Sequence, residues 1–278
     1  MRTILGLLVL SITALPASRV LVHGHRGARA VLPENTIPAF EYAIQAGVDV
    51  LELDVSVTRD KVLVVSHDPA LDSSICTGWP HRTPIRLLSL AQLQKVDCGS
   101  LKNPEFPKQK PVPGARIPTL DEVFALAKRG DFEFNVETKI FAKYPFLTPG
   151  PGEFARMLYD AIRKHGLEQR VIVQSFDFRT LHAMKKLNPK IRLSALYDGA
   201  PRSFIAIAKE AGAQIVSPEH RLVTKEQVDA AHKAGLQVVA WTTNAPADWK
   251  RLVECGVDAI ISDDPAELLA FLGRARSR

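Results

Sequence analysis

The sequence predicts one (β/α)₈ TIM barrel with an added β-hairpin arm and a small insertion after the strand that carries His67. Apolar strand-like runs alternate with helical segments, which is the pattern of a parallel sheet covered by helices. Nine runs are present, one more than a barrel contains. The third run lies too close to the second for a parallel crossover between them. An open doubly wound sheet is the alternative, but no glycine-rich phosphate loop follows the first run.

Helical segments separate nearly all of the expected strands. One helix is expected from Thr36 to Gln45, where Gly47 follows. Another begins at the capping box Thr119-Leu-Asp-Glu122, and a late one begins at Asp264-Pro265, with proline in its first position. The expected strands are Val20–His23, Val48–Val55, Val62–Ser66, Phe132–Glu137, Val171–Gln174, Ile191–Leu196, Gln214–Val216, Leu236–Trp241 and Ala259–Ile261.

The second and third apolar runs are predicted to form a hairpin. Only Ser-Val-Thr-Arg-Asp-Lys separates Val55 from Val62, which is far too short for a parallel crossover. A tight turn fixes the register and places Asp54 opposite Ser66 or His67. The third run is therefore expected to be an antiparallel arm outside the parallel strands of the barrel.

A proline-rich stretch, residues 69–118, interrupts the alternation of strands and helices. Trp79, Phe106 and a short helical segment at Leu90–Lys95 indicate a small subdomain over the barrel mouth, and an irregular excursion is the alternative. Two of the three cysteines, Cys76 and Cys98, fall within this stretch. They could pair if the protein is exported, which would leave Cys255 as a free thiol.

Length and composition are those of a single globular domain. The chain has 278 residues, of which 46% are hydrophobic and 24% charged, and its net charge is +6. The basic residues are spread along the chain and form no visible patch, so nucleic-acid binding is not expected. The sequence does not indicate an oligomeric state.

Residues 1–18 have the pattern of a secretory signal peptide ahead of a barrel domain at residues 19–278. Arg2 supplies a positive charge, the run from Thr3 to Leu15 is apolar, and Pro16-Ala17-Ser18 offers small residues near a cleavage site. The run is shorter than the roughly 20 apolar residues of a spanning helix, so no stable membrane insertion is expected after signal removal. A secreted or periplasmic protein is therefore expected. A buried first strand or helix of the domain is the alternative.

Two carboxylates, Glu52 and Asp54, share one face of an otherwise apolar strand, because alternate side chains of a strand point the same way. Burying two adjacent negative charges is costly unless a cation neutralises them, although a salt bridge or an exposed edge would also explain the pair. A second strand places Asn135, Glu137 and Lys139 on one face, so Glu137 is the expected third ligand. Three carboxylates favour one divalent cation, Ca²⁺ or Mg²⁺, over Zn²⁺.

Two histidines are expected beside these carboxylates. The hairpin register brings His67 there, and His25 ends the first strand, at the end of a barrel where catalytic groups lie. Two imidazoles with Arg26 and Lys139 nearby suit phosphoryl chemistry, because one imidazole can accept a proton from the attacking oxygen while the other protonates the leaving group. His23 is an alternative to His25 if the strand continues regularly past it.

The run HRGARAVLPENTIPAFEYAIQAGVDVLELDVSVTRDKVLVVSHDP, from His25 to Pro69, resembles the glycerophosphodiester phosphodiesterase family. Members of that family share His-Arg-Gly, Glu-Asn-Thr, Glu-x-Asp and His-Asp in this order, and the resemblance covers essentially the whole chain after residue 18. It continues through Ile117-Pro-Thr-Leu120, Asn135-Val-Glu-Thr-Lys139, Gln174-Ser-Phe176, Trp241-Thr-Thr-Asn244 and Ile261-Ser-Asp263.

The resemblance implies a metal-dependent enzyme that hydrolyses glycerophosphodiesters to glycerol 3-phosphate and an alcohol. In the scheme of the family, the neighbouring glycerol hydroxyl attacks phosphorus, a cyclic phosphate forms and water opens it. The site residues that it implies are His25 as general base, His67 as general acid, Glu52, Asp54 and Glu137 as metal ligands, Arg26 and Lys139 as phosphate contacts, and Trp241 in the substrate cleft.

The chain departs from the family pattern in two places. Leu71-Asp-Ser-Ser-Ile-Cys-Thr-Gly78 stands where the family often has Arg-Thr-Thr, and Glu137-Thr138-Lys139 replaces the common Glu-Ile-Lys. Two other functions remain open at this point. A phospholipase C- or D-like enzyme of the same barrel type would act on (lyso)phospholipids and expose apolar residues for docking to lipid, whereas a non-catalytic binding barrel would lack some of the site residues.

Overall fold

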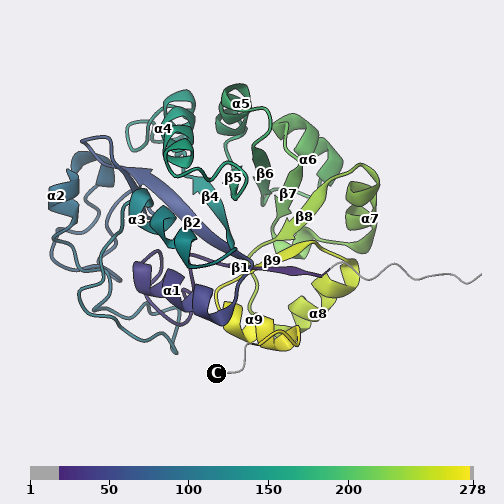
Figure 1. Ribbon diagram of the computed structural model, residues 1–278, viewed down its shortest axis with the longest axis horizontal. Helices are drawn as coiled ribbons and strands as arrows, with labels where there is room; N and C mark the ends of the chain where they lie inside the picture. Colours follow the sequence, from purple (N-terminus) through teal and green to yellow (C-terminus); the bar gives the residue numbers. More distant parts are fainter. Residues whose placement is uncertain (1–18, 276–278) are drawn as a thin grey trace, which may run out of the picture.

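The computed structural model describes residues 19–275, which form a closed (β/α)₈ barrel (Figure 1). Eight parallel strands pair in sequence around the ring, and the last of them, β9, pairs with the first, β1. The signal peptide expected at residues 1–18 lies outside the described residues. The barrel strands are β1 (Leu21–Gly24), β2 (Val50–Val57), β4 (Glu133–Thr138), β5 (Val171–Ser175), β6 (Arg192–Tyr197), β7 (Ile215–Pro218), β8 (Gln237–Ala240) and β9 (Ala259–Ser262).

Helices cover the outside of the barrel (Figure 1). No helix among residues 19–275 is long and apolar enough to cross a membrane. The helices are α1 (Ile37–Ala46), α2 (Leu90–Leu93), α3 (Leu120–Ala125), α4 (Pro151–Lys164), α5 (Phe178–Leu187), α6 (Phe204–Ala211), α7 (Lys225–Lys233), α8 (Pro246–Cys255) and α9 (Pro265–Phe271), with short 3₁₀ turns η1 (Ile85–Leu87), η2 (Leu126–Arg129) and η3 (His220–Leu222).

Helix ends follow the signals in the sequence. Thr36 is the N-cap of α1 rather than its first residue, and Gly47 closes the helix with a φ of 93°, which favours glycine. Thr119 and Glu122 form the predicted capping box at the start of α3. The Asp264 side chain caps α9 by accepting a hydrogen bond from the backbone of that helix.

The apolar core of the barrel has two parts. The larger cluster lies between the barrel and its helices and includes the fully buried Trp249 and Phe40. The smaller cluster consists of strand side chains, among them Ile172, which is two residues before the inward-pointing Gln174 and so shares its inner face. The barrel interior is therefore apolar where the strands begin and polar where they end. This arrangement places a polar site at the carboxyl-terminal mouth of the barrel.

The predicted hairpin is present. Strand β3 (Leu63–Val65), shorter than the expected run, pairs antiparallel to β2, with Val55 opposite Val65 and Val57 opposite Leu63. This register continues to Asp54, whose carbonyl oxygen accepts a hydrogen bond of 2.9 Å from the Ser66 backbone. The arm thus carries the next residue, His67, to the side of Asp54, as the hairpin register requires.

The insertion is a small subdomain with a core of its own. Cys76 and Cys98 form a disulfide, and Cys255 is a free cysteine. The disulfide belongs to a buried apolar cluster against which Trp79 packs. The other buried members of this cluster are Val64, Leu71, Ile85, Leu88, Leu93, Val96 and Ile117. The buried core of the insertion therefore consists of aliphatic side chains and the disulfide, and one aromatic side chain packs against it.

We predict that the double variant Cys76→Ser/Cys98→Ser loses about 3 kcal/mol of unfolding free energy, because the disulfide joins residues 22 apart and restricts the unfolded chain. Urea unfolding measures the difference. Cys255→Ser, which removes a thiol without removing a crosslink, is the control and should unfold like the unsubstituted protein. An unchanged stability in the double variant would show that the disulfide does not stabilise the fold.

Candidate active site

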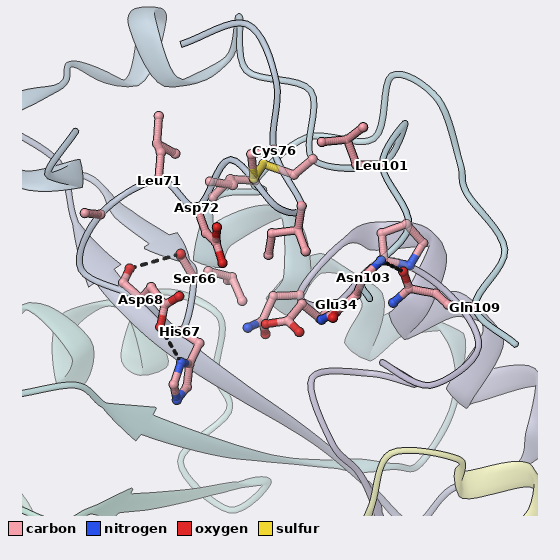
Figure 2. Close-up of a pocket in the computed structure, with 17 residues that line it drawn as sticks. Glu34, Ser66, His67, Asp68, Leu71, Asp72, Cys76, Leu101, Asn103 and Gln109 are labelled. Atoms are coloured by element: carbon pink, nitrogen blue, oxygen red, sulfur yellow. Dashed lines mark hydrogen bonds and ion pairs between the residues drawn. A yellow bond between two sulfur atoms is a disulfide. The ribbon is translucent and has the colours of Figure 1, made fainter. Parts of the chain in front are cut away.

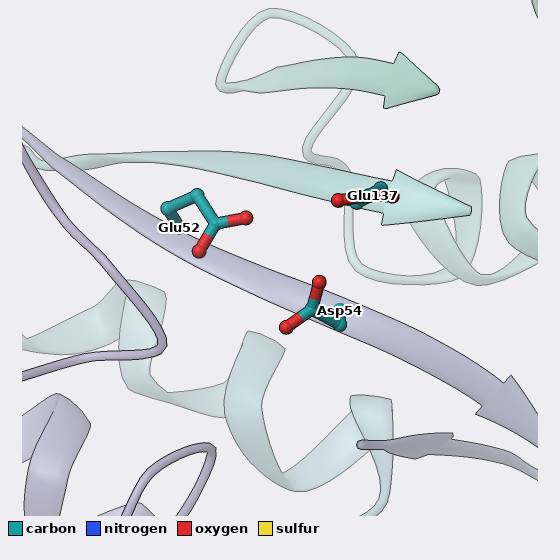
Figure 3. A group of neighbouring side chains, drawn as sticks. All are labelled: Glu52, Asp54 and Glu137. Carbon is teal, nitrogen blue, oxygen red and sulfur yellow. The ribbon is translucent and has the colours of Figure 1, made fainter. Parts of the chain in front are cut away.

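Three buried carboxylates meet where the middle of β2 lies beside the carboxyl-terminal end of β4 (Figure 3). The strands pair with Glu52 opposite Asn135 and Asp54 opposite Glu137, so all four side chains share the inner face. Glu52, Asp54 and Glu137 are 2%, 1% and 5% exposed. One oxygen atom from each lies within 4.8 Å of the others, which is close enough for three ligands of one cation. A purely oxygen donor set suits Ca²⁺ or Mg²⁺.

Two basic side chains neutralise part of this negative charge. The Lys139 ammonium lies 3.2 Å from Asp54 Oδ1 and 2.9 Å from Glu137 Oε1, and Arg26 Nε lies 3.3 Å from Asp54 Oδ2. Among the described residues, no Lys or Arg side chain lies at ion-pair distance from Glu52. Arg26 is shared with Glu34, whose Oε1 atom lies 2.6 Å from Arg26 Nη1, so the two basic side chains do not neutralise all three carboxylates. The donor set and its charge therefore fit a divalent cation.

The pKa values of the three carboxyls differ because their neighbours differ. Burial raises the pKa of Glu52 well above its ordinary value, and the charges of Asp54 and Glu137 raise it further. Burial also raises the pKa of Glu137, and Lys139 offsets only part of that shift. Burial opposes ionisation of Asp54 too, but Lys139 and Arg26 hold the pKa of Asp54 well below its usual range. Without a cation, the cluster therefore holds a proton more readily than isolated carboxylates do.

These pKa directions predict that binding of Mg²⁺ or Ca²⁺ releases protons and strengthens as pH rises. A carboxyl with a raised pKa must lose its proton before it can bind a cation. The apparent affinity therefore falls as pH drops through the raised pKa values of Glu52 and Glu137 and levels off above them. Isothermal titration in two buffers of different ionisation enthalpy measures the released protons. Identical heats in both buffers over this pH range would contradict the prediction.

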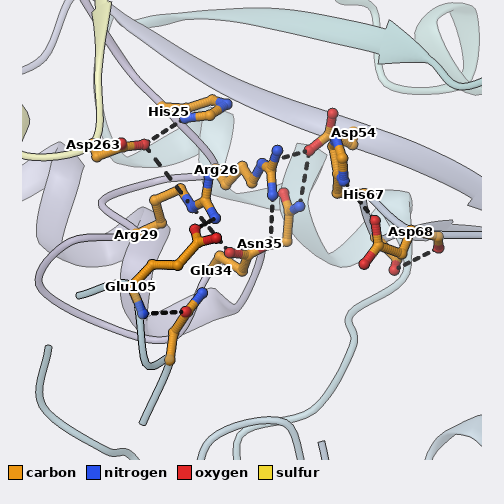
Figure 4. Close-up of polar contacts among 12 residues, drawn as sticks. His25, Arg26, Arg29, Glu34, Asn35, Asp54, His67, Asp68, Glu105 and Asp263 are labelled. Atoms are coloured by element: carbon orange, nitrogen blue, oxygen red, sulfur yellow. Dashed lines mark hydrogen bonds and ion pairs between the residues drawn. The ribbon is translucent and has the colours of Figure 1, made fainter. Parts of the chain in front are cut away.

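His25 lies in the turn that follows β1, with its side chain 12% exposed. Its Nδ1 atom lies 2.5 Å from Asp263 Oδ1 (Figure 4). Its Nε2 atom lies 3.9 Å from Glu52 Oε2. Burial lowers the pKa of His25, although the neighbouring Asp263 raises it in part. A neutral imidazole with Nε2 beside the carboxylates is suited to accept a proton.

His67 follows the hairpin arm and has a side chain that is 33% exposed. Its Nδ1 atom lies 2.8 Å from Asp68 Oδ1, so the contact with Asp68 does not involve its Nε2 atom (Figure 4). The hydrogen bond to His67 lowers the pKa of Asp68, which keeps this carboxylate charged. The Asp68 carboxylate holds the Nδ1 side of the ring, so Nε2 is the atom of His67 available for proton transfer.

All eight residues predicted for the site line one cavity of about 470 Å³. They are His25, Arg26, Glu52, Asp54, His67, Glu137, Lys139 and Trp241. Trp241 lies across the mouth, where its ring packs edge-on against Phe176 at 5.5 Å. The structure therefore brings the predicted residues together, and their individual roles remain predictions.

His23, the alternative to His25, lies beneath the site and not in it. Its side chain is 1% exposed, and burial lowers the pKa of His23 to about 3. Strand β1 ends at Gly24, where any side chain would meet the Gly27 carbonyl oxygen at 2.4 Å. The chain turns there, so His25 leaves the regular strand and reaches the cavity.

The insertion packs against the segment that carries His67 (Figure 2). A second cavity of about 40 Å³ lies between them, bounded by His67, Asp68 and the Cys76–Cys98 disulfide. Leu71 and Leu101 of the insertion also line it. The insertion therefore helps to form the wall behind His67, on the side away from the main cavity.

Several polar residues of the site were not predicted from the sequence. Gln174 donates a hydrogen bond of 2.8 Å to Glu52 Oε1, and Asn35 donates one of 3.0 Å to Asp54 Oδ2. Arg29 lines the main cavity, and its Nε atom lies 3.0 Å from Glu34 Oε2. These residues lie within or beside the motifs that carry the family resemblance, but neither their spacing nor their type indicates which carboxylate they contact.

The fold and the site define the chain as a barrel enzyme with acid–base groups and a site suited to a divalent cation. The profile of the glycerophosphoryl diester phosphodiesterase family matches residues 25–267, and the chain belongs to this family. The resemblance noted in the sequence is thus confirmed.

Relatives and solved structures agree with this assignment. A glycerophosphodiester phosphodiesterase of Caldanaerobacter subterraneus subsp. tengcongensis is 34% identical over 252 residues, which cover 90% of this chain and 97% of the relative. A structure assigned to the same family, from Silicibacter pomeroyi, has a TM-score of 0.86 at 30% identity and covers 92% of this chain and 93% of its own. An Oleispira antarctica phosphodiesterase in complex with the product sn-glycerol-3-phosphate has a TM-score of 0.77 at 25% identity, with coverage of 91% and 96%.

Proposed function

We propose that this protein hydrolyses glycerophosphodiesters to glycerol 3-phosphate and an alcohol with the help of Ca²⁺ or Mg²⁺. The observation that carries the proposal is one cavity in which the carboxylates of Glu52, Asp54 and Glu137 lie together with basic side chains and two histidines. Family membership and the product bound to the Oleispira antarctica phosphodiesterase support the choice of substrate class.

The basic side chains and the histidines have different roles in the proposed reaction. Arg26 and Lys139 contact the anionic phosphate, whose charge they offset. A divalent cation bound by Glu52, Asp54 and Glu137 would withdraw further charge from the phosphorus oxygens. These contacts favour the transition state, in which the phosphoryl oxygens carry their greatest charge.

The first step forms a cyclic phosphate and releases the alcohol. His25 Nε2 accepts the proton of the glycerol hydroxyl next to the phosphate, and that oxygen bonds to phosphorus. The bond from phosphorus to the alcohol oxygen breaks, and His67 Nε2 supplies the proton that the alcohol takes away. In the second step the roles reverse: His67 accepts a proton from water, the water oxygen bonds to phosphorus, and His25 returns a proton to the ring oxygen as the ring opens.

An assay of glycerol 3-phosphate release tests the proposed function. The substrates are the choline, ethanolamine, glycerol and inositol diesters of glycerol phosphate, each with Ca²⁺ and with Mg²⁺. We expect metal-dependent release of glycerol 3-phosphate from at least one of these substrates. An absence of turnover on the whole panel would overturn the proposal, and the pattern of rates identifies the preferred alcohol and cation.

Exposed aromatic residues at the mouth support a second candidate function, the hydrolysis of lysophospholipids. Phe146 and Tyr144, in the loop after β4, are 70% and 45% exposed, and the Lys143 ammonium lies 5.5 Å from the Tyr144 ring centre. Aromatic rings with an adjacent cation are typical of residues at a lipid surface. Phe146→Ser should slow turnover of micellar lysophosphatidylcholine and spare soluble glycerophosphocholine, and Ile205→Ser on α6 is the control. Equal effects on both substrates would exclude this function for the loop.

We also propose that residues 1–18 direct export to the periplasm or the medium. The disulfide between Cys76 and Cys98 supports this proposal, because disulfides persist in oxidising compartments. Intact mass and N-terminal sequencing of the protein from each cell fraction test it. A cytoplasmic protein that retains residues 1–18 would contradict it.

A further inference from the structure

The first and last strands of the barrel bring two distant residues together. Strands β1 and β9 are parallel neighbours with Gly24 opposite Ser262, so the residues that follow them, His25 and Asp263, leave the barrel side by side. The His25 backbone donates a hydrogen bond of 2.9 Å to the Ser262 carbonyl oxygen, which fixes the spacing of the two chains. The His25 Nδ1 and Asp263 Oδ1 atoms then lie 2.5 Å apart (Figure 4).

Asp263 is held in place by groups other than His25. Asn244, just after β8, donates a hydrogen bond of 2.7 Å to Asp263 Oδ2 and accepts one of 2.8 Å from the Asp263 backbone. The Arg29 Nε atom lies 4.0 Å from Asp263 Oδ1. Burial disfavours the charge of Asp263, but His25, Arg29 and Asn244 lower the pKa of Asp263 below its ordinary value. The carboxylate is therefore charged and has little freedom to rotate.

We infer that Asp263 is a positioning residue that fixes the tautomer and the orientation of His25. A carboxylate at Nδ1 accepts a hydrogen bond from the protonated Nδ1, which leaves Nε2 unprotonated and directed toward the cavity. The inference rests on the proposed function, because it takes His25 to be the base that accepts a proton at Nε2. Asn244 does not contact His25 in this arrangement but holds the second carboxylate oxygen of Asp263 by a hydrogen bond.

Burial distinguishes this pair from other histidine–aspartate pairs of the described chain. The side chains of His25 and Asp263 are 12% and 7% exposed. In the pair of His165 with Asp121, at 2.7 Å, the aspartate is 48% exposed, so water competes for its oxygens. Asp121 lies on α3, outside the cavity, and therefore provides a matched control for removal of a histidine's carboxylate partner.

The test compares Asp263→Asn with Asp121→Asn. Asparagine keeps the size of aspartate but carries no charge, and its amide can donate to Nδ1, which would place the proton of His25 on Nε2. We expect Asp263→Asn to lower kcat by about 10²–10⁴-fold, the range of a lost acid–base group, while KM changes little. Asp121→Asn should keep both constants. A wild-type kcat in Asp263→Asn would overturn the inference.

A double-mutant cycle shows whether Asp263 acts through His25. If it does, His25→Ala/Asp263→Asn should be no slower than His25→Ala alone. Multiplicative losses would mean that Asp263 acts by another route and would also overturn the inference. If His25→Ala itself retains full activity, the proposed role of His25 fails. If only Asp263→Asn retains it, the inference fails and the proposed function stands.

The unsubstituted protein offers a measurement that does not depend on the folding of a variant. Nitrogen-15 NMR of the imidazole rings distinguishes the two neutral tautomers of histidine. We expect His25 to carry its proton on Nδ1, with Nε2 unprotonated, when the imidazole is neutral. A proton on Nε2 in the neutral state would overturn the inference even if Asp263→Asn failed to fold.

Discussion

His25→Ala is expected to lower kcat for glycerol 3-phosphate release by about 10²–10⁴-fold, because acid–base groups typically contribute that much to turnover. The alanine leaves the carboxylates in place but removes Nε2, which lies 3.9 Å from Glu52 Oε2. Steady-state kinetics on the best diester of the panel measures the loss.

His182→Ala is the control for the removal of an imidazole. His182 lies on α5 outside the cavity, with Nε2 2.7 Å from the Glu210 carbonyl oxygen. We expect its kcat to stay near that of the unsubstituted protein. If His25→Ala also turned over substrate at the rate of the unsubstituted protein, His25 would have no role in the mechanism. Circular dichroism must show that both variants are folded.

Removal of the divalent cation is the second change with a large expected effect. Excess chelator should abolish diesterase activity, and Ca²⁺ or Mg²⁺ should restore it, because the charges of Glu52, Asp54 and Glu137 otherwise repel an anionic phosphate. Glu52→Gln should weaken cation binding and lower activity at a fixed cation concentration.

Glu133→Gln provides the matched control for this experiment. Glu133 begins β4, the strand that carries Glu137, but it pairs with Arg192 at 2.9 Å and does not line the cavity. We expect this variant to bind the cation and to turn over substrate normally. Full activity of the unsubstituted protein in excess chelator would defeat the metal assignment.

Local sequence patterns predicted the part of the site that depends on nearby residues. Glu52 and Asp54 share a face because side chains alternate along a strand, and a short turn placed Asp54 opposite Ser66. Neither argument requires knowledge of the rest of the chain. The convergence of Glu137 additionally requires β2 and β4 to be neighbours, which follows once the hairpin arm is removed from the count of parallel strands.

The remaining contacts depend on how distant strands align. Asp263 is 238 residues from His25, and the two meet only because the barrel closes between its last and first strands. Gln174 reaches Glu52 across the interior, from 122 residues away. No pattern of residue types specifies the relative shift of strands around a closed barrel, so a single sequence did not reveal these contacts.

The pairing of β9 with β1 makes closure of the barrel depend on its last residues. A chain truncated after β8 would contain every carboxylate of the proposed cation site, yet it would lack Asp263 and the strand that carries it. It would also lack Arg274, which contacts the Val20 carbonyl oxygen and Asp49 at the start of the barrel. The two ends of the chain must therefore meet before His25 acquires its contact with Asp263.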